Sequence, residues 1–331
     1  MFQGKRILIT GGTGSFGQAF TAALLERHPG VAEVIVFSRD EHKQFEMSQR
    51  FPYPKLRFIL GDIRDAERVE WAFRGVDYIV HAAAQKHVPL AEFNPMECIK
   101  TNIIGAENII KAALNTGVER ILALSSEKAA APINLYGATK LCADKLFVAA
   151  NHMSSQRQPL RCSVVRYGNI IGSRGSVAPF FRGRQASGKL PITDPAMTRF
   201  NISPDEGVDF VFKALENAWG GEIFVPRIPS FRIIDLAEAV CPSCEQEIIG
   251  TRPGEKLHEE MITETEAAHT LAFPDHFVIT PAIGTWTQAG YQAEKGGESL
   301  PAGFKYVSNN NDRWLSVAEL REQVNRYVQE D

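Results

Sequence analysis

The chain of 331 residues lacks any apolar stretch long enough to cross a bilayer, which argues against a helical membrane protein. The apolar run nearest its start, Ile7–Ile9, is short and leads into glycines, so it does not have the pattern of a secretion signal. The chain also lacks a large excess of positive or negative charge, because its formal net charge is only −3 at pH 7. That balance gives no reason to expect nucleic acid or an acidic membrane surface as a partner. We therefore predict a cytoplasmic protein.

Cysteine is scarce as well. The chain has 5 cysteines, an odd number scattered along the sequence, which favours reduced thiols over a disulfide framework. Cys241 and Cys244 form a single CxxC motif without a second pair and without the strand–turn context of a redox site. A metal or redox role stays open for this pair, but we interpret the two residues as incidental free thiols. The sequence thus predicts no metal site.

Internal repeats and low-complexity segments are missing too, and 44% hydrophobic with 23% charged residues is typical of a globular protein. Short apolar runs alternate with helical patterns through the first half of the chain. This alternation predicts an α/β fold with a Rossmann-like, doubly wound parallel sheet over residues 1–170. A smaller, mixed C-terminal lobe is expected over residues 171–331, with some segments returning to the first domain. The predicted strands cover residues 5–10, 33–37, 56–60, 77–81, 120–125 and 161–166, and the clearest helices cover residues 18–27, 96–116 and 314–328.

A glycine motif follows the first predicted strand and precedes a helix. Its glycines are Gly11, Gly14 and Gly17, spaced GxxGxxG. Glycines at such a junction allow a tight turn and let backbone amides approach a pyrophosphate at the helix N-terminus. The motif in this setting predicts a dinucleotide-binding site.

The residues after the second predicted strand indicate which dinucleotide is bound. An acidic residue there would bind the adenosine ribose hydroxyls, but this chain has Ser38 and Arg39, with Lys43 close behind. A hydroxyl, a guanidinium and an ammonium favour a 2′-phosphate, so we predict NADP rather than NAD. The carboxylate of Asp40 would oppose binding of a 2′-phosphate, unless its side chain points outward or caps the next helix.

Other polar or small residues lie at the ends of later strands, where an open parallel sheet binds its ligands. Asp62 is placed to meet an adenine amino group, or alternatively to cap a helix that starts near Asp65. Small residues from Ala82 onward let the backbone lie against a cofactor, and Lys86 would enter the space between cofactor and substrate.

The stretch from residue 124 to 140 holds two pairs of reactive residues. Tyr136 and Lys140 are one helical turn apart, and a neighbouring ammonium favours a phenolate. This pair could accept a proton from an alcohol that is being oxidised. Glu127 and Lys128 are adjacent and could supply a second proton transfer. Without the rest of the chain, Tyr136 and Lys140 would be interpreted as an ordinary pair on a helix surface, and Glu127 and Lys128 as part of a solvated loop.

Beyond residue 170 proline, glycine and arginine become frequent. Arg199 and Arg252 belong to two basic segments, which suggests a second anionic ligand such as a nucleotide diphosphate. Scattered surface arginines remain the alternative for Arg182 and Arg184. Residues 264–312 are polar with weak periodicity.

Together these features resemble the extended short-chain dehydrogenase/reductase superfamily, and within it the nucleotide-sugar 4,6-dehydratases. The longer motifs resemble the soluble, inverting UDP-N-acetylglucosamine 4,6-dehydratases that open pseudaminic acid biosynthesis. These motifs are Thr13–Phe16, Ser38–Asp40, Ala82–Pro89, Ile133–Lys140, Val165–Asn169, Gly172–Ser176 and Arg252–His258.

The resemblance implies NADP as cofactor, UDP-N-acetylglucosamine as substrate, and a homo-oligomer, often a hexamer. It implies that the cofactor contacts Gly11, Thr13, Gly14, Ser15, Phe16, Gly17, Ser38, Arg39, Asp40, Lys43, Asp62, Ile63, Ala82, Lys86, Thr101, Leu124, Ser125, Tyr136, Lys140 and Ile170. It implies that the substrate contacts Lys86, Ser126, Asn169, Val177, Arg199, Arg252 and Glu255.

The resemblance also implies catalytic roles. Tyr136, assisted by Lys140, would take the C-4 hydroxyl proton during oxidation, and the C-4 ketone makes the C-5 proton acidic. Lys128, with a depressed pKa and a neutral amine, would take the C-5 proton, while a protonated Glu127 would protonate the departing C-6 hydroxyl. Reprotonation from the other face would invert C-5, and the hydride would return to C-6.

Two positions depart from the family pattern. Glu127 stands where the family has aspartate, and the extra methylene predicts a displacement of about 1 Å, which can cost on the order of 100-fold in rate. Asn201 stands where an aromatic residue is expected.

Three alternatives remain. A nucleotide-sugar epimerase needs Tyr136 and Lys140 but not Glu127 and Lys128. A dehydratase for another nucleotide sugar would share all four residues. A non-catalytic NADP-binding regulatory protein would tolerate loss of Tyr136, so the intact motif counts against it.

Overall fold

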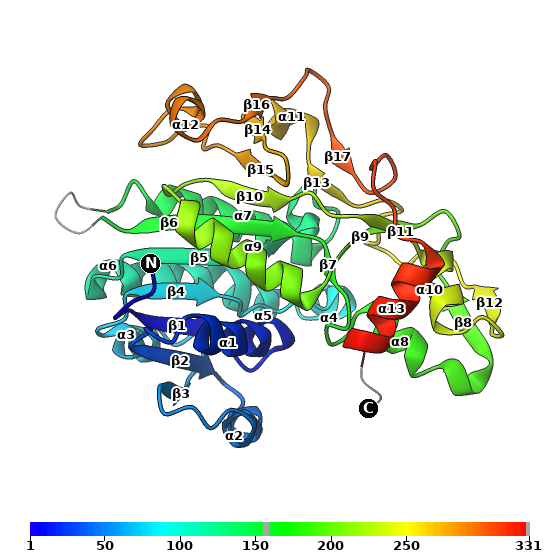
Figure 1. Cartoon of the computed structure of the whole chain (residues 1–331), viewed down its shortest axis with the longest axis horizontal. Helices are drawn as coiled ribbons and strands as arrows, with labels where there is room; N and C mark the ends of the chain where they lie inside the picture. The colour runs from blue at the N-terminus through cyan, green and yellow to red at the C-terminus, as the bar shows by residue number, and fades with distance from the viewer. Residues whose placement is uncertain (155–158, 329–331) are drawn as a thin grey trace.

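A computed structural model describes residues 1–154 and 159–328, and its centre is a ten-stranded sheet with helices on both faces (Figure 1). All six strands predicted in the first half are present, to within a residue at either end. The elements of this half are β1 (Arg6–Thr10), α1 (Ser15–Arg27), β2 (Glu33–Ser38), α2 (Glu41–Arg50), β3 (Leu56–Leu60), α3 (Ala66–Phe73), β4 (Tyr78–His81), α4 (Val88–Phe93), α5 (Pro95–Ile99), a π-helix (Lys100–Ile104), α6 (Gly105–Thr116), β5 (Arg120–Ser126), the 3-10 helix η2 (Glu127–Ala129), α7 (Leu135–Ala150) and β6 (Arg161–Tyr167).

The order of the parallel strands is that of a doubly wound sheet. From β1 the chain adds β2 and β3 on one side, then returns to add β4, β5 and β6 on the other. The strand order therefore reverses between β1 and β4, where Thr10 pairs with His81. Ligands of such sheets bind at the carboxyl ends of the strands beside this reversal. Gly11 and Ala82 follow these two strands directly.

Two apolar cores fix the sheet between its helix layers. On one face, side chains of α3, α6 and α7 such as Val69, Ile109 and Phe147 pack together. On the other face, Phe20 of α1 packs with residues of α9 (Pro204–Asn217) such as Val211. Burying a large apolar side chain contributes about 1.5–3 kcal/mol, so these layers hold the strand ends, and hence the site, in place.

The main sheet does not stop at residue 170. Strand β10 (Ile223–Pro226) adds parallel to β6, and β15 (His276–Ile279), β14 (Thr270–Ala272) and β16 (Glu298–Ser299) then add antiparallel strands. Residues 264–312, with weak periodicity in the sequence, supply most of this extension and also hold α11 (Glu264–Ala267), α12 (Gln288–Lys295) and β17 (Tyr306–Val307). The domain division at residue 170 stays a prediction.

The remaining C-terminal elements form small sheets and a third apolar core at one end of the molecule (Figure 1). The small sheets pair β11 with β9 and β7, β12 with β8, and β13 with β17. The elements are β7 (Asn169–Ile170), α8 (Val177–Arg182), a 3-10 turn (Gln185–Ser187), β8 (Lys189–Ile192), β9 (Thr198–Ile202), β11 (Ser230–Arg232), α10 (Ile233–Val240), β12 (Glu245–Ile248), β13 (Glu260–Ile262) and the closing helix α13 (Val317–Tyr327).

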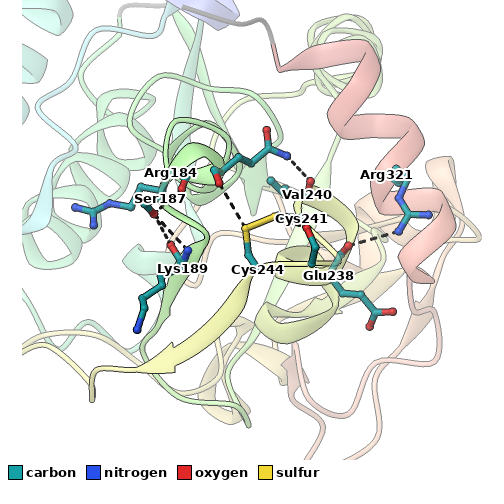
Figure 2. Close-up of a disulfide and its surroundings, with 10 residues drawn as sticks. Arg184, Ser187, Lys189, Glu238, Val240, Cys241, Cys244 and Arg321 are labelled. Atoms are coloured by element: carbon teal, nitrogen blue, oxygen red, sulfur yellow. Dashed lines mark hydrogen bonds between the residues drawn. A yellow bond between two sulfur atoms is a disulfide. The ribbon is translucent and has the colours of Figure 1, made fainter.

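The prediction of free thiols at the CxxC motif is wrong, because Cys241 and Cys244 form a disulfide (Figure 2). Cys241 ends α10, and the turn that follows brings the two Cα atoms to 5.4 Å, a separation that a disulfide bridges readily. Cys98, Cys142 and Cys162 are free.

Within residues 1–154 and 159–328 we find no helix with the length and hydropathy needed to cross a membrane. The same residues contain no group of three or more His, Cys, Asp or Glu side chains that could hold a metal ion.

Candidate active site

The glycine loop has the geometry of an anion-binding turn. Gly11 has a φ of +66°, and a Cβ atom added there would lie 2.8 Å from the Ala83 nitrogen of the neighbouring strand end. Only glycine fits this position without strain. Gly14 is the N-cap residue of α1, and no side chain caps that helix, so its first amides remain available for a ligand. The residues therefore fit the pyrophosphate of a dinucleotide.

Asp40 caps α2, the helix that follows β2. This was one of the two positions predicted for its side chain, the other being outward into solvent. Its carboxylate accepts a hydrogen bond from the Lys43 amide at 3.1 Å and lies 2.6 Å from Lys43 Nζ. Lys43 is thereby paired, and the Ser38 hydroxyl accepts a hydrogen bond from Gln44. Arg39, whose side chain is 61% exposed, has only a 4.0 Å contact with Asp62. Arg39 is thus the cation most available to a 2′-phosphate.

Asp62 is not a helix cap, because Asp65 caps α3. Arg64 donates to the Asp62 carboxylate from both its backbone and its guanidinium. Burial opposes ionisation of Asp62, but these hydrogen bonds outweigh it and lower the pKa of the carboxyl. The Thr101 hydroxyl is buried and donates to the Glu97 carbonyl, whereas Lys86 is exposed on the segment after β4.

The structure brings the two predicted reactive pairs together at the end of β5. The turn η2 carries Glu127 and Lys128, and α7 begins at Leu135 after its cap, Asn134. Gly137 makes the close approach of these elements possible, since a Cβ atom there would overlap the Lys128 carbonyl oxygen. Tyr136 therefore lies near the acid and the amine, with which it interacts electrostatically.

Glu127 and Lys128 are hydrogen-bonded rather than solvated. Glu127 is 2% exposed; its carboxylate accepts from the Ser126 hydroxyl at 2.8 Å and from Lys128 Nζ at 2.9 Å. Lys128 Nζ also lies 2.7 Å from Oε1 of Glu259. Burial lowers the pKa of Lys128, but the two carboxylates outweigh it and raise the pKa above the ordinary lysine value. The predicted depressed pKa of Lys128 is therefore wrong for this arrangement.

The predicted effect of Lys140 on Tyr136 is also wrong here. Burial and the Glu127 carboxylate raise the pKa of the Tyr136 phenol. Lys140 Nζ donates instead to the Leu124 carbonyl at 2.6 Å, and burial lowers the pKa of this lysine although Asp144 opposes the change. The phenol thus carries its proton in this structure.

Four of the seven predicted substrate residues fall into two groups. Asn169 and Val177 line a small hollow, together with Ser176, whose buried hydroxyl lacks a partner among the described residues. Arg252 and Glu255 pair with each other at 3.1 Å on a largely exposed loop. That loop lies against the reactive turn, because Gly254 accepts from Asn134 and Lys256 donates to Ala130.

Arg199 is buried beside the reactive pair, where its Nε lies 3.6 Å from Glu259. Asn201, the departure from the family pattern, is buried and donates to Gln323 of α13.

Sequence reasoning missed Glu259 and Lys256. Both lie in or next to the basic motif 252–258, but their contacts with residues 127–130 join segments more than a hundred residues apart.

Comparison with known proteins agrees with the family resemblance seen in the sequence motifs. The family model described as "Polysaccharide biosynthesis protein" matches residues 7–281. An inverting UDP-N-acetylglucosamine 4,6-dehydratase of Campylobacter jejuni is 52% identical over 332 residues, covering 98% of each chain. A UDP-glucose 4-epimerase of Rickettsia conorii is 40% identical, covering 100% of this chain and 99% of its own length.

Among solved structures, the X-ray structure of Pen from Bacillus thuringiensis superposes with a TM-score of 0.89 at 35% identity, covering 98% of each chain. The relation seen in the motifs is thereby confirmed. The chain belongs to the polysaccharide biosynthesis protein family and, within it, to the group that contains the inverting UDP-N-acetylglucosamine 4,6-dehydratases.

Proposed function

We propose that the chain is an NADP-dependent UDP-N-acetylglucosamine 4,6-dehydratase that inverts C-5. Its product would be a UDP-2-acetamido-2,6-dideoxy-hexos-4-ulose for sugars of the pseudaminic acid type. One observation carries the proposal: Glu127, a buried carboxylate, lies in hydrogen-bond contact with the half-buried amine of Lys128, next to Tyr136. An enzyme that only oxidises and reduces C-4 has no use for the first two groups. The C. jejuni relative supports the substrate and the outcome at C-5.

The cofactor site would consist of the glycine loop and Arg39. The dinucleotide, when bound, supplies reversible hydride transfer. Tyr136 would accept the proton of the C-4 hydroxyl, which first requires the phenol to lose its own proton. Positive charge near a phenol lowers its pKa, and an oxidised nicotinamide ring has the required sign.

A single proton shift prepares the other two groups. Lys128 Nζ and Glu127 Oε1 are 2.9 Å apart. Moving one proton from the ammonium to the carboxylate yields a neutral amine and a carboxylic acid together. The amine can then remove the C-5 proton, and the acid can protonate the departing C-6 hydroxyl. The raised pKa of Lys128 is therefore compatible with a role as base, because the proton that it must lose has an acceptor within reach.

Mass analysis of the product formed from UDP-N-acetylglucosamine tests the proposal. We expect the sugar to lose one water, and solvent deuterium to enter at C-5. An unchanged mass with altered stereochemistry would identify an epimerase instead. A protein that binds the cofactor and leaves the substrate intact would be the regulatory alternative.

The epimerase alternative has specific support, because the R. conorii relative matches along the whole chain. It would act through Tyr136 and Lys140 and would not use the hydrogen-bonded Glu127–Lys128 pair. Dehydration of the sugar decides between the two functions. A homo-oligomer and a cytoplasmic location stay predictions, and light scattering tests whether the oligomer is a hexamer.

A further inference from the structure

Glu259 is a buried carboxylate in direct contact with Lys128. It is 2% exposed; its Oε1 lies 2.7 Å from Lys128 Nζ and 3.6 Å from Arg199 Nε. Its Oε2 is buried and receives no hydrogen bond from any of the described residues. A buried carboxylate oxygen without a donor is costly. A group retained at that cost beside a reacting amine points to a role in the chemistry.

The backbone holds Glu259 firmly in this position. The Glu259 amide donates to the Ser308 hydroxyl at 2.9 Å, and the Ser308 amide donates to the Glu259 carbonyl at 2.8 Å. Ser308 is fully buried, and the adjacent residues form the β13–β17 pair. The carboxylate is therefore presented to Lys128 by a strand pair rather than by a free loop.

We propose that Glu259 is a positioning residue for Lys128, holding the amine beside Glu127 and stabilising the ammonium that forms when the amine takes the C-5 proton. The step moves one proton from C-5 to Lys128 Nζ, and the electrons of the C–H bond pass into the C-4 ketone. Glu259 keeps its charge throughout, and no oxidant or reductant is needed. The inference rests on the proposed function for its substrate but not for the Lys128–Glu259 contact.

The charges around Lys128 give the direction of the effect. Burial and Arg199 lower the pKa of Lys128, whereas Glu127 and Glu259 raise it. Removal of the Glu259 charge leaves Glu127 as the one carboxylate among these groups, so the pKa should fall. Lys256 and Tyr136 also interact electrostatically with this cluster, and His258 interacts with Arg199.

The first test is the titration of Lys128 itself, which is independent of turnover. NMR of protein with ¹³C-labelled lysine, with the Lys128 signal assigned by its loss in Lys128→Arg, measures this pKa. In Glu259→Gln we expect it to fall by about 1–3 pH units, the usual effect of one close opposite charge. An unchanged pKa would overturn the proposal. Should that variant not fold, a Lys128 pKa at or below the ordinary lysine value in the unmodified protein would overturn it instead.

The second test is the rate of solvent deuterium incorporation at C-5. Glu259→Gln should lower it at least about 10-fold, because the amine is then no longer held beside Glu127 in the position from which it removes the C-5 proton. Glu259→Asp keeps the charge and should restore the Lys128 pKa, although its shorter side chain leaves the rate reduced. Glu260→Gln removes the same charge one residue away, without contact to Lys128, and should change neither quantity.

The outcomes separate the two proposals. If the unmodified protein neither loses water from the sugar nor exchanges C-5, the proposed function fails, and the titration still decides the role of Glu259. If dehydration occurs and Glu259→Gln exchanges C-5 at the unmodified rate, the positioning role fails alone.

Discussion

The surroundings raise the pKa of both Lys128 and Tyr136, so each favours its protonated form and would have to lose a proton before acting as a base. Burial and Glu127 raise the pKa of the phenol, whereas two carboxylates raise that of the amine. In the proposed mechanism the two bases act in order, because the C-5 proton becomes acidic only after C-4 is a ketone. Substitution at each residue should therefore stop the reaction at a different stage.

Tyr136→Phe should abolish every step, since C-4 cannot be oxidised without a proton acceptor. Lys128→Ala should still allow that oxidation but block removal of the C-5 proton. Deuterium incorporation at C-5 should be absent in both variants, while absorbance of the reduced nicotinamide should rise on substrate addition in Lys128→Ala alone. C-5 exchange at the unmodified rate in Lys128→Ala would make Glu127 the first candidate for the base.

The choice of cofactor also depends on single residues. NADP should bind more tightly than NAD, and Arg39→Ala should weaken NADP by about 10- to 100-fold while leaving NAD almost unchanged, because a hydrogen bond to a charged group is worth about 1.5–3 kcal/mol. Titration of both cofactors into the apo protein measures this. Lys43→Ala is the matched control, since Lys43 is paired with Asp40 and should contribute less. Equal affinities in the unmodified protein would refute the NADP assignment.

At the scale of elements, the reactive residues depend on the contact between η2 and α7. Gly137 permits that contact, because an added Cβ atom would overlap the Lys128 carbonyl and lie 3.0 Å from Pro132. The first turn of α7 and the turn that carries Glu127 are thus fixed as one unit. A change that separates them should disturb the chemistry more than it disturbs cofactor binding.

Gly137→Ala should lower the free energy of unfolding by about 1–3 kcal/mol, the usual cost of overpacking, and reduce the dehydration rate at least 10-fold. Urea unfolding and product formation measure the two effects. Gly207→Ala is the matched control, because Gly207 is also helical but has open space around its Cβ position. That control should leave stability unchanged or raise it by up to about 1 kcal/mol. Equal behaviour of the two variants would contradict a special role for Gly137.

The elements of the first half were predictable because each carries its own local signal. The parallel strands are apolar runs bounded by glycine or polar residues, and five to seven residues form most of them. Strands β14, β15 and β16 were missed because they are two to four residues long and become strands only through antiparallel pairing with one another and with β10. The disulfide was missed because its formation depends on the turn after α10, which spacing alone does not specify.

At the scale of the molecule, the proximity of the two proposed reactive pairs was predictable from the sequence, but the direction of the pKa shifts of Lys128 and Tyr136 was not. Tyr-x-x-x-Lys and Glu127–Lys128 are local patterns, so their proximity followed from the strand–helix order. The second carboxylate in contact with Lys128 belongs to Glu259, 131 positions later in the chain. No local sequence pattern predicts that contact. The pKa of an amine is determined by such neighbours, which is why the predicted direction was wrong for Lys128 and Tyr136.

The Lys128–Glu259 contact has a consequence for the order in which the protein becomes competent during synthesis. During translation the glycine loop, strands β1 to β6 and helix α7 leave the ribosomal exit tunnel well before residue 259 does. A nascent chain of that length has the parts of a nucleotide pocket, but its reacting lysine has only one of its two carboxylate neighbours. Under the proposed function, the parts of the dinucleotide site therefore leave the ribosome before the acid–base centre is complete, and a translation product interrupted in this interval would lack Glu259 beside Lys128.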